Sequence, residues 1–147
     1  MTGYHQSPAE ILAFSLGLSP QSIAASTAAN GNGVDMQGWD GCLFVLLLGV
    51  IDGVQDMKAQ GDDNSGFSSA TDITGAAITQ VAATGDDKIY LLDVWRPTER
   101  YIRPVVTNGA GAVADFQAVL TIRYRATGRL PMSQHSTVGE LKKVAVN

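Results

Sequence analysis

Residues 116–126, Phe-Gln-Ala-Val-Leu-Thr-Ile-Arg-Tyr-Arg-Ala, carry the clearest period-two pattern of the chain. Successive side chains of a β-strand point to opposite faces of a sheet, so this alternation predicts a strand with one apolar face. We expect that face to be buried, which requires a sheet packed over a core. The residues predicted to point inward are Phe116, Ala118, Leu120, Ile122, Tyr124 and Ala126, and those predicted to point outward are Gln117, Val119, Thr121, Arg123 and Arg125.

Residues 42–51 form a second decisive stretch, an apolar run interrupted only by Gly49. Its near absence of polar alternation is typical of a strand buried on both faces, and its β-branched residues favour a strand over a buried helix. Seven or eight short strands, spaced by about ten residues and joined by turns rich in Gly, Asp and Asn, predict an all-β domain with a jelly-roll-like β-sandwich. The other strand candidates are residues 23–27, 34–36, 54–60, 67–73, 78–82, 88–95 and 101–107.

Both ends of the chain are expected to lie outside the sandwich. Ser7, Pro8 and Glu10 are typical of a helix start, because serine can cap the helix and glutamate can reach back to it. The short apolar helix that follows, ending near Gly17, must dock on its own domain or on a neighbouring subunit. The tail either forms a short capped turn or becomes ordered only on a partner. We therefore expect a short N-terminal helical arm at residues 1–20, a β-sandwich domain at 21–131 and a C-terminal tail at 132–147.

Charge is unevenly distributed along the 147 residues, whose formal net charge is −4. Residues 1–95 hold two Lys against eleven acidic residues, whereas residues 96–147 hold six Arg and two Lys against three acidic residues. Either the two halves compensate each other within the folded domain, or copies of the protein present opposite charges to one another. The acidic total argues against general nucleic-acid binding, which requires a basic footprint.

No motif of the sequence indicates an active site. Cys42 is the only cysteine and is expected to be a buried apolar residue, and both histidines lie in the terminal segments. Residues 62–64, Asp-Asp-Asn, lack the spacing of a calcium-binding loop and are expected to form a solvated turn. We expect a protein that is not an enzyme and uses no cofactor or metal ion.

No segment of the sequence suggests contact with a membrane. The apolar run at residues 42–51 is far shorter than the about 20 residues that a membrane-spanning helix needs. The first residues lack the basic cluster and apolar core of a secretory signal. We therefore expect synthesis and folding in a cytoplasm.

Arginine residues of the C-terminal third are the main candidates for contacts with other proteins. Arg123 and Arg125 share the predicted outward face of their strand and would form a positive stripe. That stripe either pairs with acidic residues of the first half or contacts an acidic neighbour, since guanidinium groups suit carboxylates. Trp39 and Trp95 are expected to belong to the core rather than to a ligand platform. The candidate subunit or capsid contacts are Arg96, Arg100, Arg103, Arg123, Arg125, Arg129, Leu141 and Val144.

A series of short segments between Gly38 and Pro131 follows the pattern of a known family. These segments are residues 41–45, 49–51, 60–64 with Phe67, 72–76, 90–94, 100–106, 123–125 and 130–131. In these segments the sequence resembles the capsid decoration, or cement, proteins that are encoded beside the major capsid protein in tailed bacteriophages. The matching residues are of the kind that build a fold and carry no catalytic motif.

The resemblance implies a jelly-roll-like subunit that assembles as a homotrimer and binds the major capsid protein on the outer capsid surface of the virion. Such a protein bridges neighbouring capsid subunits against internal pressure, after its synthesis in the cytoplasm of a bacterial host. Two alternatives stay open. One is a jelly-roll carbohydrate-binding or tail-associated adhesion module, and the other is a head–tail connector subunit.

Overall fold

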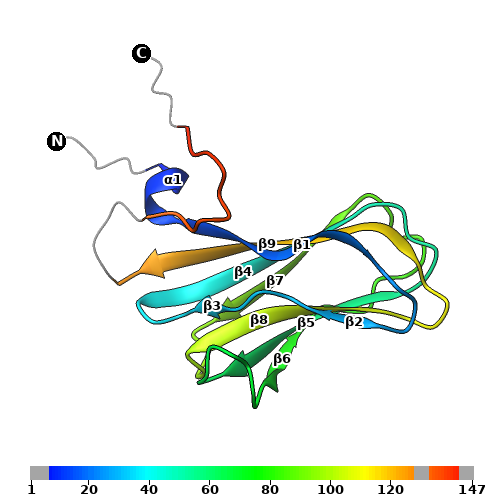
Figure 1. Ribbon diagram of the computed structural model, residues 1–147, viewed down its shortest axis with the longest axis horizontal. Helices are drawn as coiled ribbons and strands as arrows, with labels where there is room; N and C mark the ends of the chain where they lie inside the picture. The colour runs from blue at the N-terminus through cyan, green and yellow to red at the C-terminus, as the bar shows by residue number, and fades with distance from the viewer. Residues whose placement is uncertain (1–6, 128–132, 143–147) are drawn as a thin grey trace.

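Two antiparallel sheets lie face to face in the computed structural model, which describes residues 7–127 and 133–142 (Figure 1). The first sheet has the strand order β1-β9-β4-β7, and the second has the order β2-β8-β5-β6 with β3 also paired to β8. The first sheet consists of β1 (Ala13–Ile23), β4 (Trp39–Leu48), β7 (Ile89–Trp95) and β9 (Ala114–Ala126). The second consists of β2 (Ala28–Asn30), β3 (Val34–Asp35), β5 (Gln55–Asp62), β6 (Thr71–Ala77) and β8 (Tyr101–Asn108).

The chain crosses from one sheet to the other at most of its connections. Only the steps from β2 to β3 and from β5 to β6 stay within one sheet, and the first and last strands lie side by side. A four-stranded and a five-stranded layer connected in this way form a jelly roll, with β2 and β3 both paired to β8. The prediction of an all-β, jelly-roll-like β-sandwich is confirmed.

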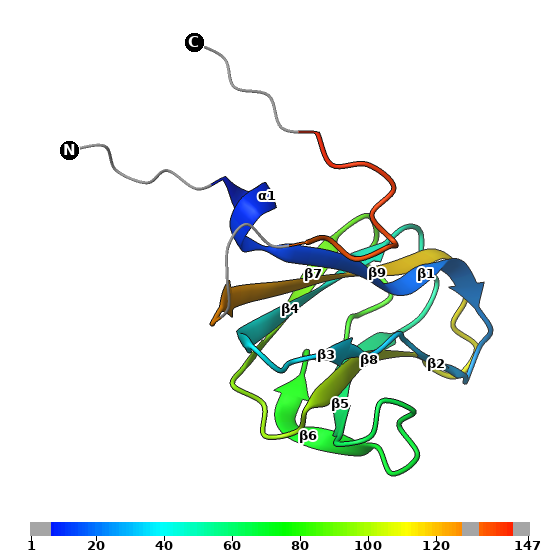
Figure 2. The same cartoon turned by 60° about the vertical axis from the view of Figure 1, so that its left-hand side comes forward.

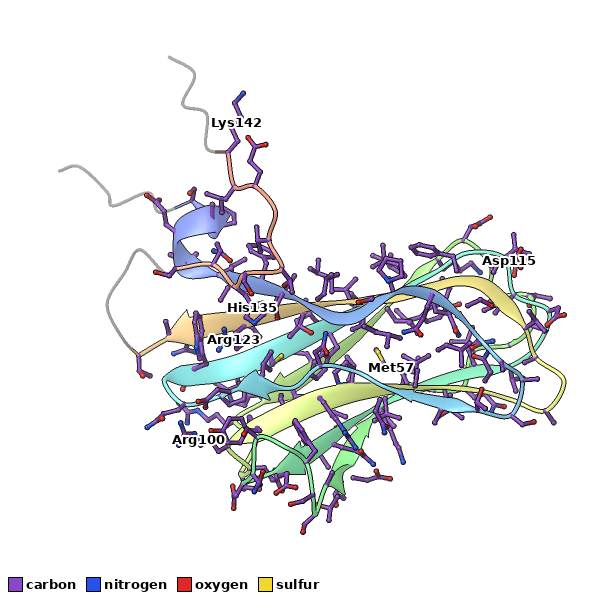
Figure 3. All side chains as sticks on the ribbon, viewed as in Figure 1. Met57, Arg100, Asp115, Arg123, His135 and Lys142 are labelled. Carbon is purple, nitrogen blue, oxygen red and sulfur yellow. The ribbon has the colours of Figure 1, made fainter. Side chains whose placement is uncertain are left out.

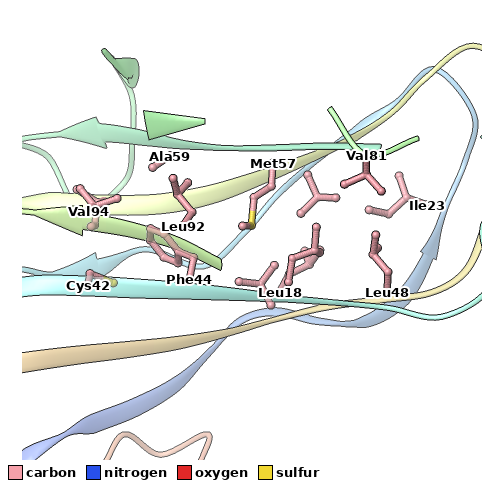
Figure 4. Close-up of a cluster of buried hydrophobic side chains, with 14 of the residues drawn as sticks. Leu18, Ile23, Cys42, Phe44, Leu48, Met57, Ala59, Val81, Leu92 and Val94 are labelled. Atoms are coloured by element: carbon pink, nitrogen blue, oxygen red, sulfur yellow. The ribbon is translucent and has the colours of Figure 1, made fainter. Parts of the chain in front are cut away.

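The core lies between the two layers, where apolar side chains from both sheets meet (Figure 4). β4 contributes Phe44 and Leu46, and the opposite sheet contributes Ile102 from β8, all three fully buried. A large side chain of this kind contributes about 1.5–3 kcal/mol when it leaves water. Further core members are Leu18, Ile23, Cys42, Leu48, Met57, Ala59, Val81, Leu92 and Val94.

The side chains of β9 point opposite to the sequence prediction. Val119 and Thr121 are fully buried and lie directly across from Leu46 and Phe44 of β4, whose side chains belong to the core. Phe116, in contrast, is 42% exposed. The inward face is therefore formed by Gln117, Val119 and Thr121, and the prediction that Phe116, Leu120, Ile122 and Tyr124 point inward is wrong.

A buried cluster of side-chain amides explains how polar Gln117 is accommodated between the sheets. Its Nε2 group donates to Oε1 of Gln55 in β5, and also to Oδ1 of Asn108 in β8 at 2.7 Å. Asn108 donates from Nδ2 to the carbonyl oxygen of Ile23, at the end of β1, at 2.6 Å. A buried polar group without a partner costs about 1–3 kcal/mol. These bonds offset that cost for Gln117 Nε2 and join both sheets, although Gln117 Oε1 and Gln55 Nε2 have no hydrogen-bond partner.

The N-terminal helix is shorter than predicted. The helix α1 spans only Pro8–Ile11, with the Ser7 backbone N–H donating to Glu10 Oε2 at 2.9 Å, and extended backbone begins at Leu12. The residues expected to continue this helix instead form β1, which pairs with β9. The predicted arm boundary at residue 20 therefore falls inside a strand of the sandwich.

The described part of the C-terminal tail lies along the outer edge of β1. Gln134 Oε1 accepts a hydrogen bond from the Phe14 backbone at 2.8 Å, and Thr137 Oγ1 accepts one from Leu16 at 3.0 Å. Gln134 Nε2 also donates to the carbonyl oxygen of Leu12 at 2.6 Å, beside α1. Figure 2 shows this segment and α1 together on the side of the first sheet that faces away from the second. In the described residues the tail docks on its own domain.

The register of β9 can be tested with two aspartate substitutions. Val119→Asp places a charge in the core without a partner and should cost at least about 4 kcal/mol, the upper end of single-substitution effects. Ile122→Asp, on the other side of the same strand, should cost clearly less because its side chain reaches water. Urea unfolding followed by circular dichroism measures both. A larger loss for Ile122→Asp would contradict the register.

Candidate interaction surface

The outer face, defined as the side of the first sheet turned away from the second, consists of rows of apolar side chains. One row runs across all four strands, because Leu120 pairs with Leu16 on one side and Val45 on the other, and Val45 pairs with Leu91. Antiparallel sandwiches usually place polar residues on this side. The outer face instead carries Phe14, Leu16, Leu43, Val45, Leu47, Ile89, Leu91, Trp95, Phe116, Leu120 and Ile122.

Much of the outer face is open to solvent in the described structure. Leu47 is 37% exposed, Trp95 47%, Leu91 55% and Ile89 60%. The C-terminal segment and α1 lie over β1 and β9, so the uncovered part is the half formed by β4 and β7 (Figures 1 and 2). Together with Phe116, these side chains leave apolar surface on the order of a few hundred Å², the size of the largest apolar patch on a typical monomer, which is often functional.

This arrangement corrects the prediction for β4. Its inward residues, such as Phe44 and Leu46, are fully buried, but Leu43 and Val45 are only partly buried and Leu47 is exposed. The strand is apolar on both sides, as the sequence indicates, yet the protein covers one side alone. A two-layer sandwich offers each sheet only one inner face. The outward residues of β4 therefore belong to the candidate interaction surface.

One end of the outer face is closed by a small aromatic cluster. The ring of Tyr124 stacks on Trp95 with centroids 6.0 Å apart, and its hydroxyl donates to Asp93. Gly41 lies between β7 and β9 beneath that ring, where a Cβ atom would overlap Tyr124. Burial, followed by the bond to Asp93, raises the pKa of Tyr124 above its ordinary value of 10.0. The cluster keeps an aromatic surface at this end of the sheet.

The candidate arginines gather at the same end of the sandwich, and each described one stacks on an aromatic ring. Arg96 and Arg125 lie over Trp95, with guanidinium carbons 5.2 Å and 5.1 Å from the ring centre. Arg103 lies 4.8 Å from the Phe67 ring centre, and Arg123 lies 4.9 Å from that of Trp39. Such contacts contribute about 0.5–1 kcal/mol at exposed sites. Arg129 and Val144 lie outside the described residues, and Leu141 is 46% exposed.

The arginines also pair with acidic residues of the first half, which supports compensation within the domain. Arg100 Nη2 lies 2.9 Å from Asp35 Oδ2, and Arg96 and Arg125 lie 3.9 Å and 3.6 Å from Asp40. The bond from Arg100 holds the pKa of Asp35 below its ordinary value of 3.8, and the bond from Asp35 raises the pKa of Arg100.

The predicted positive stripe is absent from the described part of β9. Arg123 points toward the second sheet, where its Nη1 donates to the Asp35 carbonyl oxygen at 2.8 Å (Figure 3). Burial lowers the pKa of Arg123. Arg125 has a φ of 52°, a left-handed conformation that interrupts the regular alternation of the strand and lets its side chain reach Trp95. Arg123 and Arg125 therefore serve different contacts.

The groups with possible chemistry have structural roles. Cys42 is fully buried, and burial raises the pKa of its thiol far above the range of a reactive cysteine. Asp62 accepts backbone hydrogen bonds from Asn64 at 2.9 Å and Ser69 at 2.8 Å, which hold the β5–β6 loop and lower the pKa of Asp62. Among residues 7–127 and 133–142, no group of three or more His, Cys, Asp or Glu side chains could hold a metal ion.

In the part of the chain that the structure describes, no helix is long and apolar enough to cross a membrane.

Comparisons with known proteins find similarity in structure but not in sequence. No protein-family model and no curated protein sequence matches the chain. PBSX exported protein XepA matches 91% of the chain with a TM-score of 0.56 and 20% identity, and the chain spans 42% of XepA. A protein from disulfide-linked pili, the Bacillus endospore appendages, matches 85% of the chain with a TM-score of 0.51 and 16% identity, over 99% of its own length. At these identities the likeness shows the fold alone.

The sequence did not lead us to the outer face, and we named the arginines as the main candidate contacts instead. The useful signal was that β4 is apolar on both sides and that every second residue of β9 is apolar. A sandwich can bury only one side of each strand, so two neighbouring strands with surplus apolar residues indicate an uncovered face. Trp95, expected in the core, belongs to that face, whereas Trp39 packs partly buried against the core as expected.

The open apolar surface can be measured without knowing its partner. Leu91→Thr should lower the fluorescence of a bound apolar dye such as anilinonaphthalene sulfonate, with little change in Tm because Thr suits a strand. Val50→Thr is a matched control, since Val50 is also 55% exposed but lies outside the strands. Equal effects of the two substitutions would contradict a continuous patch on the outer face.

The ion pair between Asp35 and Arg100 should appear in the acid unfolding of the protein. Because the pKa of Asp35 is lowered in the folded state, its stabilising effect is complete above its ordinary value of 3.8. That effect is lost as pH falls through the lower folded pKa. Arg100→Gln should reduce this acid-induced loss by at most about 1 kcal/mol, because both side chains are partly exposed.

Urea unfolding between about pH 2 and pH 5 measures this dependence. Arg96→Gln removes an arginine that is 65% exposed and lies 3.9 Å from its acidic partner, so it is a suitable control. Parallel pH curves for wild type and Arg100→Gln would show that the pair does not contribute.

Proposed function

We propose that this chain is a structural protein of a phage particle that binds the outer capsid surface and bridges major capsid protein subunits. The observation that carries the proposal is the apolar outer face of the first sheet, with Leu47, Ile89 and Leu91 between 37% and 60% exposed. Such a surface suits a permanent contact with another protein rather than turnover of a small molecule.

The size and composition of the outer face suit attachment to a repetitive shell. A stable interface buries about 800 Å² on each partner, so a few hundred Å² of apolar surface supplies a core that polar contacts must surround. Arg96 and Arg125, beside Trp95, lie at one rim of the face and supply such polar groups. A shell presents the same site many times, so modest contacts add up to firm attachment.

Two further lines support a particle protein. The resemblance to capsid decoration proteins rests mostly on segments within or next to β4, β5, β6, β7, β8 and β9, whereas residues 49–51 lie between strands and residues 130–131 lie outside the described residues. The fold is also that of an exported protein of phage PBSX and of a pilus-forming appendage protein, both described as exported or assembled proteins. The homotrimer implied by the resemblance stays a prediction.

A carbohydrate-binding role is less well supported by the positions of the tryptophans. Sugar-binding platforms need an open aromatic ring, but Trp95 is stacked by Tyr124 and by Arg96 and Arg125. Trp39 is covered by Arg123. A head–tail connector differs from a decoration protein in its copy number, because a connector forms a single ring at one vertex whereas decoration proteins cover the shell.

Binding to purified expanded capsids of the corresponding phage tests the proposal. We expect the wild-type protein to sediment with capsids in many copies and to raise the temperature at which they release DNA. The double variant Leu47→Ser/Leu91→Ser should bind at least about tenfold more weakly while keeping its fold, because it removes apolar side chains from the centre of the face.

Val50→Ser is the matched control, because it changes an exposed apolar residue outside the strands. Folded wild-type protein that fails to bind capsids would refute the capsid role. Binding in a single ring of copies would favour the connector.

A further inference from the structure

The two edges of the first sheet differ in how they are protected. At the β1 edge, side chains cap the backbone: Gln134 and Thr137 accept from Phe14 and Leu16, and Asn32 donates to the Leu16 carbonyl oxygen at 3.1 Å. At the opposite edge, β7 pairs only with β4 among the described residues. Open edges pair readily with other strands, and proteins normally blunt them with lysine, proline or bulges. Ile89–Trp95 contains no lysine, proline or bulge and a single charged residue, Asp93.

Two backbone hydrogen bonds, one at each end of the β4–β7 pair, show which backbone groups of β7 point to the open edge. The Leu48 N–H donates to the Lys88 carbonyl oxygen at 3.1 Å, and the Arg96 N–H donates to that of Asp40 at 2.8 Å. Residues that exchange bonds alternate with residues that do not in an antiparallel pair. The even-numbered residues of β7 therefore bond to β4, and the N–H and C=O groups of the odd-numbered residues point outward.

Space beside β7 is available at both of its ends. A hollow of about 460 Å³ is lined by Val81, Lys88 and Tyr90, near the start of the strand. A second hollow of about 280 Å³ is lined by Ile73, Val94 and Trp95, near its end. Among the described residues β7 does not pair with β6, its neighbour in the other sheet, and these hollows separate the two elements at both ends.

We propose that β7 pairs antiparallel with β7 of a second copy, so that two first sheets join into one eight-stranded sheet. Charge favours this occupant, because antiparallel pairing brings the Arg96 end of one copy to the Asp86 end of the other. Asp86, in the turn before β7, and Arg96, directly after β7, lie outside the strand, and the left-handed backbone of Asp87 and Arg96 ends the regular pairing. With Leu91 opposite its own counterpart, these opposite charges come to the same end of the pair without lying directly across from each other. The backbone favours this register, because the N–H and C=O groups of Leu91 both point to the open edge and can exchange two bonds with the Leu91 of the second copy.

This pairing does not depend on the capsid role, but it predicts a dimer in place of the homotrimer that the resemblance implies. It needs only the edge of β7, and it leaves the side chains of the outer face exposed on one side of the joined sheet. The two outer faces become continuous, which doubles the apolar surface that one assembly offers to a partner. A symmetric contact of this type closes after two copies, because each edge is used once.

Two substitutions at one position separate edge pairing from contact through the outer face. Leu91→Pro removes an N–H group that points to the open edge and leaves the bonds to β4 in place, a position where strands tolerate proline. Leu91→Ala keeps that N–H group and removes most of the apolar side chain. We expect a dimer for wild type and Leu91→Ala, and at least about tenfold weaker dimerisation for Leu91→Pro, since two hydrogen bonds are lost by symmetry.

Sedimentation velocity of the full chain over a concentration series measures the association, with circular dichroism to check folding. Hydrogen exchange on the wild type provides a second measurement that does not depend on a variant. The Leu91 and Asp93 amides should become protected as dimer forms, whereas Leu92 should be protected at every concentration. A monomer or a trimer at all concentrations, loss of the dimer in Leu91→Ala but not in Leu91→Pro, or unchanged Leu91 exchange would overturn the proposal.

Discussion

The position of Gln117 is the constraint on which the rest of the sandwich depends. β9 pairs with strands on both sides, so a shift of one residue would turn every one of its side chains to the opposite face. Gln117 holds the observed register because its amide finds buried partners on β5 and β8. The same cluster reaches the end of β1 through Asn108. One polar network thus links four strands and determines what the first sheet presents to solvent.

Once that register is set, the outer face follows from the neighbours of β9. Leu120 and Ile122 must point outward when Val119 and Thr121 point inward, and pairing extends the apolar rows onto β4 and β7. Gln117 and Thr121 lie inside, where the Nε2 group of Gln117 has amide partners but its Oε1 atom and the Thr121 hydroxyl have none, whereas Leu120 and Ile122 lie outside. This inversion leaves apolar side chains in contact with water, an arrangement that favours covering of the sheet by another protein.

The sequence predicted where several strands lie, but it did not predict which face of β9 is buried. The turns and β-rich segments predicted β5, β7 and β8 within a few residues, as well as the two-layer architecture, because these depend on local propensity and spacing. The face of β9 could not be predicted, since the partners of Gln117 lie on other strands. The predicted length of the N-terminal helix was wrong for a similar reason, because pairing of β1 with β9 outweighs the marginal stability of a short helix. The arginines were found as a cluster, but their aromatic and acidic partners required the fold.

The open face and the open edge use different groups, and this decides what kinds of assembly the chain can build. The face offers side chains perpendicular to the sheet, whereas the edge of β7 offers backbone groups within its plane. Occupying one therefore does not block the other. Pairing at the edge closes after two copies, so it cannot by itself form a filament or a shell. Growth or attachment must then proceed through the face, where a repetitive partner surface would bind two joined sheets far more firmly than one.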